Sequence, residues 1–79
     1  MARSLRTPGH RALMRVLREA RQARGLTQAA LAERLGRPQS YIAKVETGER
    51  RLDVVEFVEV ARALDADPAE LLAPVVEAA

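Results

Sequence analysis

A short polar stretch near the middle of the chain carries side chains that can hydrogen-bond to the edges of nucleobases. When residues 39–47 are placed on a helix at about 100° per residue, one arc holds Gln39, Ser40, Ala43, Lys44 and Thr47. Glutamine can pair with adenine through two hydrogen bonds, lysine can reach O6 and N7 of guanine, and serine accepts several partners. The small side chain of Ala43 would let the helix approach closely. An ordinary solvated helix face has a similar composition, so the neighbouring elements must decide between the two interpretations.

Two short helical patterns separated by a glycine surround this arc. One face of the first pattern holds Leu31, Ala32 and Leu35, and the inward face of the second holds Ile42, Val45 and Glu46. Gly36 lies between the patterns, where the chain must bend sharply, and such a bend often requires a positive φ. The combination is typical of a helix-turn-helix, whose second helix enters the major groove of DNA. It therefore favours base recognition over a merely solvated face.

Residues on either side of the two helical patterns are candidates for contacts with the phosphate backbone. Thr27 is a natural N-cap, and Gln28 follows it in the first turn, beside amide groups and the positive end of the helix dipole. Gln28 can therefore either contact phosphate or cap its own helix. Arg50 and Arg51 follow the second pattern and can form either a second phosphate clamp or a solvated basic loop.

The rest of the chain predicts an all-α domain of five helices. Thr7 caps a helix over about residues 8–23, in which arginines 11, 15 and 18 form a stripe, and at least two of the three are expected only to keep the helix soluble. Asp53 caps a fourth helix. A capping box over residues 67–70 starts a fifth, which Pro74 should end or kink, because proline lacks a backbone N–H. We divide the chain into a flexible basic arm (1–7), a helix-turn-helix domain (8–73) and a C-terminal tail (74–79).

The charge of the chain is distributed unevenly along its length. Residues 1–24 carry seven arginines and one glutamate, a charge of +6, and Arg3 and Arg6 of this group lie in the arm. Residues 25–52 carry +2, and residues 53–79 carry −6, so the overall +2 hides a strongly basic beginning and an acidic end. The basic part is suited to a polyanion, and the acidic part must face away from it or meet a protein partner.

Several classes of protein are disfavoured by composition. There is no cysteine, which excludes disulfides and thiolate metal sites, and the one histidine, His10, is expected to be solvated and has no clustered acid–base partner. We therefore expect no enzyme, no cofactor and no metal. No stretch approaches the roughly 20 apolar residues of a membrane span, so the expected location is the cytoplasm, in association with the nucleoid.

From about Leu13 to Leu72 the sequence resembles the lambda-repressor-like, Cro-type helix-turn-helix family, the XRE regulators. The matching residues are Arg21, Gly25–Gln28, Leu31, Ala32, Leu35, Gly36, Tyr41, Ile42, Val45, Glu46, Gly48, Leu64, Pro68, Leu71 and Leu72. The resemblance implies a five-helix domain that binds double-stranded DNA, usually as a homodimer on a palindromic operator. Arg37 departs from the pattern, because the family usually has an apolar or small residue in that turn position.

The resemblance also assigns roles to individual residues. By position, Gln39, Ser40 and Lys44 would read bases. The residues expected at the DNA backbone or its flank are Thr27, Gln28, Arg37, Tyr41, Thr47, Arg50 and Arg51. Arg21 and Glu46 would form an ion pair that fixes the recognition helix. Independently of the resemblance, the apolar residues near the end of the chain, Leu72, Val75 and Val76, either form the dimer surface or complete the core of the monomer.

We expect a transcriptional repressor that acts as a homodimer. The alternative is the antitoxin of a toxin–antitoxin pair, which would bind both its own operator and a toxin, and the acidic half of the chain would suit such a partner. A third possibility is a protein-interaction module that has lost DNA binding. A toxin-like gene beside this one would favour the antitoxin, and DNA affinity itself would separate the interaction module.

Overall fold

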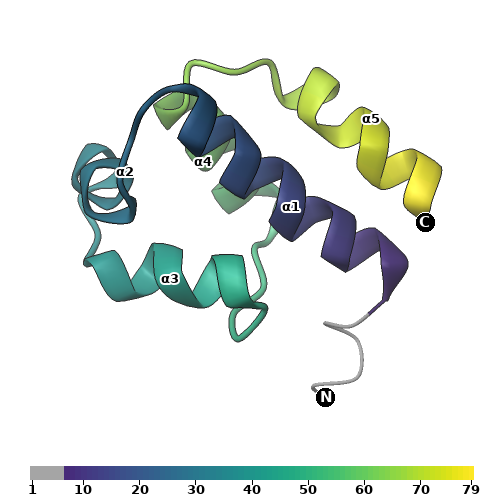
Figure 1. Cartoon of the computed structure of the whole chain (residues 1–79), viewed down its shortest axis with the longest axis horizontal. Helices are drawn as coiled ribbons and strands as arrows, with labels where there is room; N and C mark the ends of the chain where they lie inside the picture. The colour runs from purple at the N-terminus through teal and green to yellow at the C-terminus, as the bar shows by residue number, and fades with distance from the viewer. Residues whose placement is uncertain (1–6) are drawn as a thin grey trace.

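The computed structural model describes residues 7–79, and within that range it contains five helices and no strand (Figure 1). The helices are α1 (Pro8–Ala23), α2 (Gln28–Leu35), α3 (Gln39–Thr47), α4 (Val54–Ala63) and α5 (Pro68–Ala78). The prediction of an all-α, five-helix domain is therefore confirmed. The predicted basic arm, with Arg3 and Arg6, lies almost wholly outside the described residues.

Helix starts are set by side chains that accept hydrogen bonds from amide groups of the first turn. Thr7 accepts from the amide of His10, and Thr27 accepts from the amide of Ala30. Such a cap satisfies one of the amide groups that have no partner inside the helix. The two threonines therefore start α1 and α2 at the places that the sequence indicates.

The two caps formed by aspartate differ from each other. Asp67 accepts a hydrogen bond from the amide of Ala69, whereas the sequence suggested a reciprocal box with Glu70. The reciprocal box is found at the start of α4 instead. There the Asp53 carboxylate accepts from the amide of Glu56, and the Glu56 carboxylate accepts from the amide of Asp53.

The turn between α2 and α3 depends on Gly36. This residue has φ 68° and ψ 30°, in the left-handed region, and nothing lies within 4 Å of the position that a Cβ would occupy. Its amide donates to the carbonyl of Glu33, and the amide of Arg37 donates to the carbonyl of Ala32, so the chain leaves α2 in a closed turn. Glycine is favoured here because of the backbone angle and not because of crowding.

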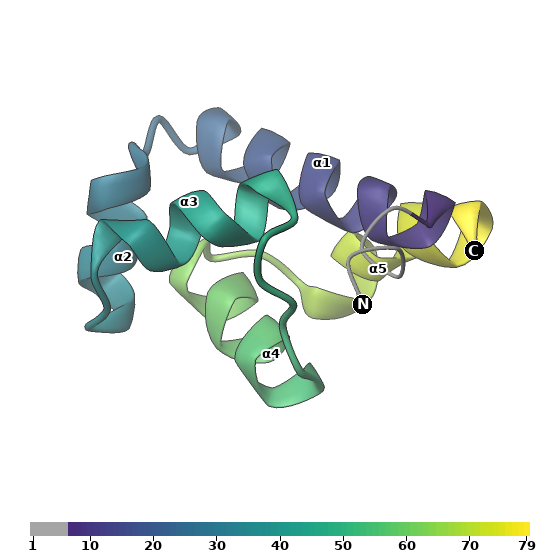
Figure 2. The same ribbon diagram turned by 90° about the horizontal axis from the view of Figure 1, so that it is seen from below.

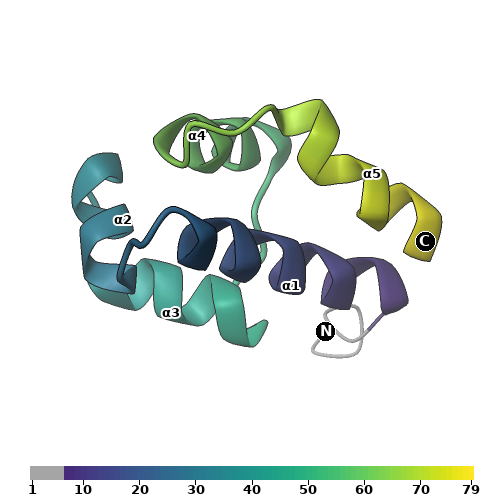
Figure 3. The same cartoon turned by 45° about the horizontal axis from the view of Figure 1, so that its top comes forward.

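The core lies where α1 passes between α3 on one side and the pair α4 and α5 on the other (Figure 3). The side chains that form it are Leu17, Leu31, Ala32, Tyr41, Ile42, Val45, Phe57, Val60 and Leu64. Phe57, Val60 and Ala61 of α4, and Leu64 directly after it, are all buried. Burial of this apolar set is the main force that holds the short helices together, because helices of 8 to 11 residues are marginal alone.

We expected Pro74 to end or kink the fifth helix; α5 continues past it to Ala78, so the first of these two alternatives is wrong. Proline removes one hydrogen bond of the helix, the one that would run from residue 74 to the carbonyl of Glu70. Packing against α1 and α4 compensates for that loss. At its far end α5 touches the beginning of α1, where a Cβ on Gly9 would lie 3.3 Å from the Cβ of Ala79.

Candidate nucleic-acid interface

A buried ion pair joins α1 to the end of α3. The Nε of Arg21 lies 2.6 Å from Oε2 of Glu46, and its NH2 group donates to Oε1 at 3.0 Å. Both side chains are almost fully buried, with 11% and 6% of their surfaces exposed. The remaining NH1 group donates to the carbonyl of Leu26 at 2.8 Å, in the turn before α2. One guanidinium thus ties α3 to α1 and to the turn before α2.

Gln28 extends this network to the surface. Its amide nitrogen donates to Oε1 of Glu46 at 3.0 Å, and its amide oxygen accepts a longer bond, 3.4 Å, from Gln39. The side chain therefore connects the buried carboxylate to the first residue of α3. Sequence reasoning placed Gln28 beside free amides but missed these two contacts. The N-cap of α2 is Thr27, whereas the side chain of Gln28 is held by Glu46.

The recognition face, which we define as Gln39, Ser40 and Lys44, lies on the outer side of α3. All three residues are exposed, whereas Ile42, Val45 and Glu46 on the inner side are buried. Figure 2 shows α3 along the near side of the molecule, with neither α4 nor α5 in front of it. The inner side of α3 is therefore packed against the domain and its outer side is exposed, as entry into a groove of DNA requires.

A second group of charges surrounds Tyr41, on the flank of α3. The guanidinium carbons of Arg37 and Arg50 lie 4.4 and 4.6 Å from the centre of the Tyr41 ring, within the range of cation–π contacts. Arg50 also donates through both terminal nitrogens to the carboxylate of Glu56, at 3.1 and 2.8 Å. Arg37 approaches the same carboxylate at 3.9 Å. We call these four residues the arginine–tyrosine cluster.

The pKa values of Glu56 and Tyr41 in this cluster differ from their ordinary values. The hydrogen bonds from Arg50 and from the Asp53 amide lower the pKa of Glu56 to about 2. Burial raises the pKa of Tyr41, a residue that is only 7% exposed. The carboxylate is therefore charged and the phenol neutral over the ordinary pH range. Glu56 itself was missed by the sequence reasoning, although its place three residues after the N-cap Asp53 was a usable signal.

The other predicted backbone contacts lie at the two ends of the helix-turn-helix. Thr47 donates to Oε2 of Glu49 at 3.1 Å and is exposed, as is Arg51. His10 is partly buried and not fully solvated as expected, and burial and the charge of Arg51 lower its pKa. The loop after α3 thus directs Arg50 inward to the cluster and leaves Arg51 at the surface.

No group of three or more His, Cys, Asp or Glu side chains in residues 7–79 is arranged to hold a metal ion. None of the helices in that range is long and apolar enough to cross a membrane.

Comparison with known proteins relates this geometry to a family. A family model described as Helix-turn-helix matches residues 17–71, which contain the second half of α1, the whole of α2, α3 and α4, and the start of α5. The chain is 37% identical over 57 residues to the HTH-type transcriptional regulator y4dJ of Sinorhizobium fredii, a match that covers 72% of this chain and 74% of that protein.

Three solved structures share the fold. An XRE-family like protein from Pseudomonas syringae pv. tomato has a TM-score of 0.82 and 49% identity, with 87% of this chain and 84% of that chain covered. The restriction-modification controller protein C.AhdI from Aeromonas hydrophila has a TM-score of 0.70 and 42% identity, with coverage of 75% and 86%. The clp gene regulator ClgR from C. glutamicum has a TM-score of 0.77 and 28% identity, with coverage of 85% and 86%. The chain therefore belongs to the XRE-type helix-turn-helix family of DNA-binding transcriptional regulators.

Proposed function

We propose that this regulator is a repressor that binds a palindromic operator as a homodimer, with α3 in the major groove. The observation that carries the proposal is the pairing of an exposed recognition face with a rigid support behind it. Gln39 and Lys44 are exposed, while Glu46 on the opposite side of the same helix is locked by Arg21. A helix held in this way can present its polar side chains to base edges at a fixed angle.

The hydrogen bonds of Gln39 are compatible with base reading. Its amide nitrogen donates to Gln28, but an amide nitrogen carries two hydrogens, and its oxygen can still accept. Recognition of adenine needs one donor and one acceptor from glutamine, so both remain available. Gln28 would then orient the Gln39 amide as well as, or instead of, contacting phosphate.

The proposal of a homodimer rests on the outer face of α5. Leu72 is 39% exposed and Val76 is 72% exposed, and residues four apart lie on the same face of a helix. Leu71 packs against the core, and Val75 is partly buried. The apolar residues of α5 thus divide between the core and an open face, and the second group is suited to a second copy of the chain.

The dimensions of the monomer agree with such a dimer. In the view of Figure 1, α5 lies on the opposite side of α1 from α3, and the longest extent of the molecule is 29 Å. Two copies that meet through α5 would place their recognition helices outward. Half-sites on one face of DNA are about 34 Å apart, a separation that two molecules of this length can span.

Selection of bound duplexes from a pool of random DNA, followed by footprinting on the promoter of the protein's own gene, tests the proposal. A repressor of this kind should enrich a site with two-fold symmetry, protect it in the promoter, and reduce transcription when bound. Recovery of no enriched sequence, at a salt concentration where random DNA is not retained, would contradict sequence-specific binding.

A further inference from the structure

The carboxylate of Glu56 holds two arginines that approach the recognition helix from opposite ends of its sequence. Arg37 lies two residues before α3 begins, and Arg50 lies three residues after it ends. Both guanidinium groups contact the ring of Tyr41, which belongs to α3 itself. Two positive groups on one ring repel each other, and the carboxylate of Glu56, on α4, offsets that repulsion.

The contacts of Arg50 leave it little freedom. Its NH1 group donates to the carbonyl of Arg51 at 2.8 Å and to Glu56, and its NH2 group donates to Glu56. Glu56 in turn is fixed by the amide of Asp53 at the start of α4. A surface arginine normally moves among many rotamers, and ordering one on binding costs roughly 0.5–1.5 kcal/mol. Here that ordering is already present before any partner binds.

We propose that Glu56 is a positioning residue for DNA binding: it holds Arg37 and Arg50 in fixed places on the flank of α3, where they meet the phosphate backbone together. The inference rests on the proposed function, since it assumes that α3 enters the groove. It assigns a role in binding a polyanion to an acidic residue, which would otherwise be expected only to repel DNA.

The sign of one substitution separates positioning from simple charge. Glu56→Gln raises the net charge by one unit, so repulsion alone predicts tighter binding to any DNA. Positioning predicts the opposite, about tenfold weaker binding to the selected operator, because two arginines must now be ordered during binding. Glutamine can still receive the Asp53 amide in a capping box, so the start of α4 is preserved.

Glu56→Asp gives an independent test, because it keeps the charge and shortens the side chain. Positioning predicts that this variant also binds the operator more weakly, since the shorter side chain cannot reach both arginines and the Asp53 amide at once. A purely electrostatic role predicts wild-type affinity for it. If Glu56→Gln does not fold, Glu56→Asp decides the question with the same measurements.

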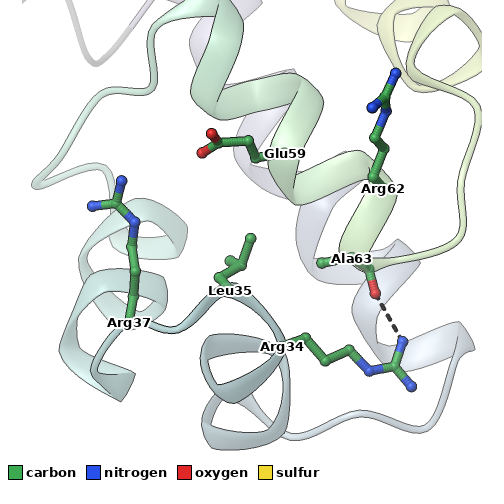
Figure 4. Close-up of a pocket in the computed structure, with 6 residues that line it drawn as sticks. All are labelled: Arg34, Leu35, Arg37, Glu59, Arg62 and Ala63. Atoms are coloured by element: carbon green, nitrogen blue, oxygen red, sulfur yellow. Dashed lines mark hydrogen bonds between the residues drawn. The ribbon is translucent and has the colours of Figure 1, made fainter.

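Glu59→Gln is the matched control. Glu59 is exposed, lies one turn further along α4, and faces the groove shown in Figure 4. That groove is lined by Arg34, Leu35, Arg37, Glu59, Arg62 and Ala63. The control makes the same change in net charge but keeps Glu56, the carboxylate that contacts both arginines of the cluster. It should bind operator DNA at least as tightly as the wild type.

The experiment is a titration of each variant against the duplex selected by the wild-type protein and against a scrambled duplex, at several salt concentrations. Positioning also predicts that the log–log salt slope of Glu56→Gln stays close to that of the wild type, because both arginines still reach phosphate once they are ordered, whereas each lost phosphate contact would lower the slope by about one. Tyr41 is the one tyrosine and there is no tryptophan, so its fluorescence reports on the cluster directly and should change in both Glu56 variants.

The outcomes are distinct. Weaker operator binding by Glu56→Gln and Glu56→Asp, with altered Tyr41 fluorescence and an unaffected Glu59→Gln, supports the proposal. Operator binding by Glu56→Gln that equals or exceeds the wild type overturns it, and only tighter binding would leave Glu56 as a charge that repels DNA. Failure of the wild-type protein itself to select any duplex would instead contradict the proposed function.

Discussion

At the scale of single residues, Glu46 is the acidic side chain that connects α3 to both α1 and α2. It accepts hydrogen bonds from both Arg21 and Gln28, and only 6% of its side-chain surface is exposed. Burying a carboxylate costs desolvation free energy. Once the pair exists, however, removal of the carboxylate leaves a buried guanidinium without a counter-charge. The loss of one partner should therefore cost far more than the pair contributes in net terms.

We predict that Glu46→Ala lowers the free energy of unfolding by about 3 kcal/mol, because Arg21 stays buried without its partner. Glu33→Ala, a substitution of an exposed glutamate on α2, should have almost no effect. Thermal and urea unfolding of both variants measures the difference. Equal melting temperatures would show that the ion pair is not important for stability.

The second prediction at this scale concerns pH and Glu56. The folded-state pKa is about 2, well below the ordinary 4.5, because Arg50 and the Asp53 amide bond the charged form. The unfolded chain therefore binds more protons than the folded chain between these values. The stabilisation from Glu56 is complete above about 4.5 and is lost progressively as the pH falls toward 2.

The difference in stability between the wild type and Glu56→Gln should consequently be largest near neutral pH and shrink as the solution is acidified through that window. Denaturant titrations at pH 7, 4 and 3 measure it. Glu59→Gln serves again as the control for the change in net charge. A difference that stays constant over the whole range would mean that the Arg50 contact does not favour the ionised carboxylate.

At the scale of elements, the helix-turn-helix separates residues that support α3 from residues that face outward. Gln39 and Lys44 lie on the recognition face, and Arg51 lies in the loop beyond the helix. Base edges differ between sequences, but phosphates are the same at every base pair. Contacts of the two kinds should therefore respond differently to a change of DNA sequence.

We predict that Gln39→Ala and Lys44→Ala weaken binding to the operator by roughly 1–3 kcal/mol each. Binding to scrambled DNA should be nearly unchanged, apart from the effect of the charge lost with Lys44. Arg51→Ala should weaken both by similar factors. Titration of the three variants at one fixed salt concentration tests this. Equal losses on both duplexes for the α3 variants would remove α3 from the role of base reader.

At the scale of the whole molecule, two exposed apolar patches compete as contact surfaces between copies. One consists of Leu72 and Val76 on α5, and the other consists of Val54 and Val55, which are 77% and 67% exposed at the start of α4. A single small domain covers little DNA, so tight and specific binding favours two copies acting together. The α5 patch is the one that would place two α3 helices outward.

We predict that the double variant Leu72→Glu/Val76→Glu sediments as a monomer at concentrations where the wild type is a dimer, and binds a two-half-site duplex far more weakly. Val54→Glu/Val55→Glu is the matched control and should remain dimeric. Dissociation of the control but not of the α5 variant would move the interface to α4. A wild type that is monomeric both alone and on DNA would refute the dimer.

The sequence by itself determined the local structure of this protein. Thr7, Thr27 and Asp53 mark helix starts, Gly36 marks the turn, and the periodicity of residues 39–47 separates Ile42 and Val45 from the outward arc. These features depend on neighbours within one or two turns, where backbone geometry leaves few alternatives. For that reason the five helices and the side of α3 that faces out could be predicted.

Apart from the Arg21–Glu46 pair, which the family resemblance implies, only the tertiary structure decided which partners the charged and apolar side chains contact. From the sequence Arg50 is as compatible with a phosphate contact or a solvated loop as with a carboxylate, and its contact with Glu56 depends on where α4 lies after the loop. Packing against α1 and α4 likewise decides that α5 continues through Pro74, and that Leu71 packs against the core while Leu72 is exposed. Spacing along the chain carries no information about such contacts, because each one is chosen by competition among groups that folding alone brings together.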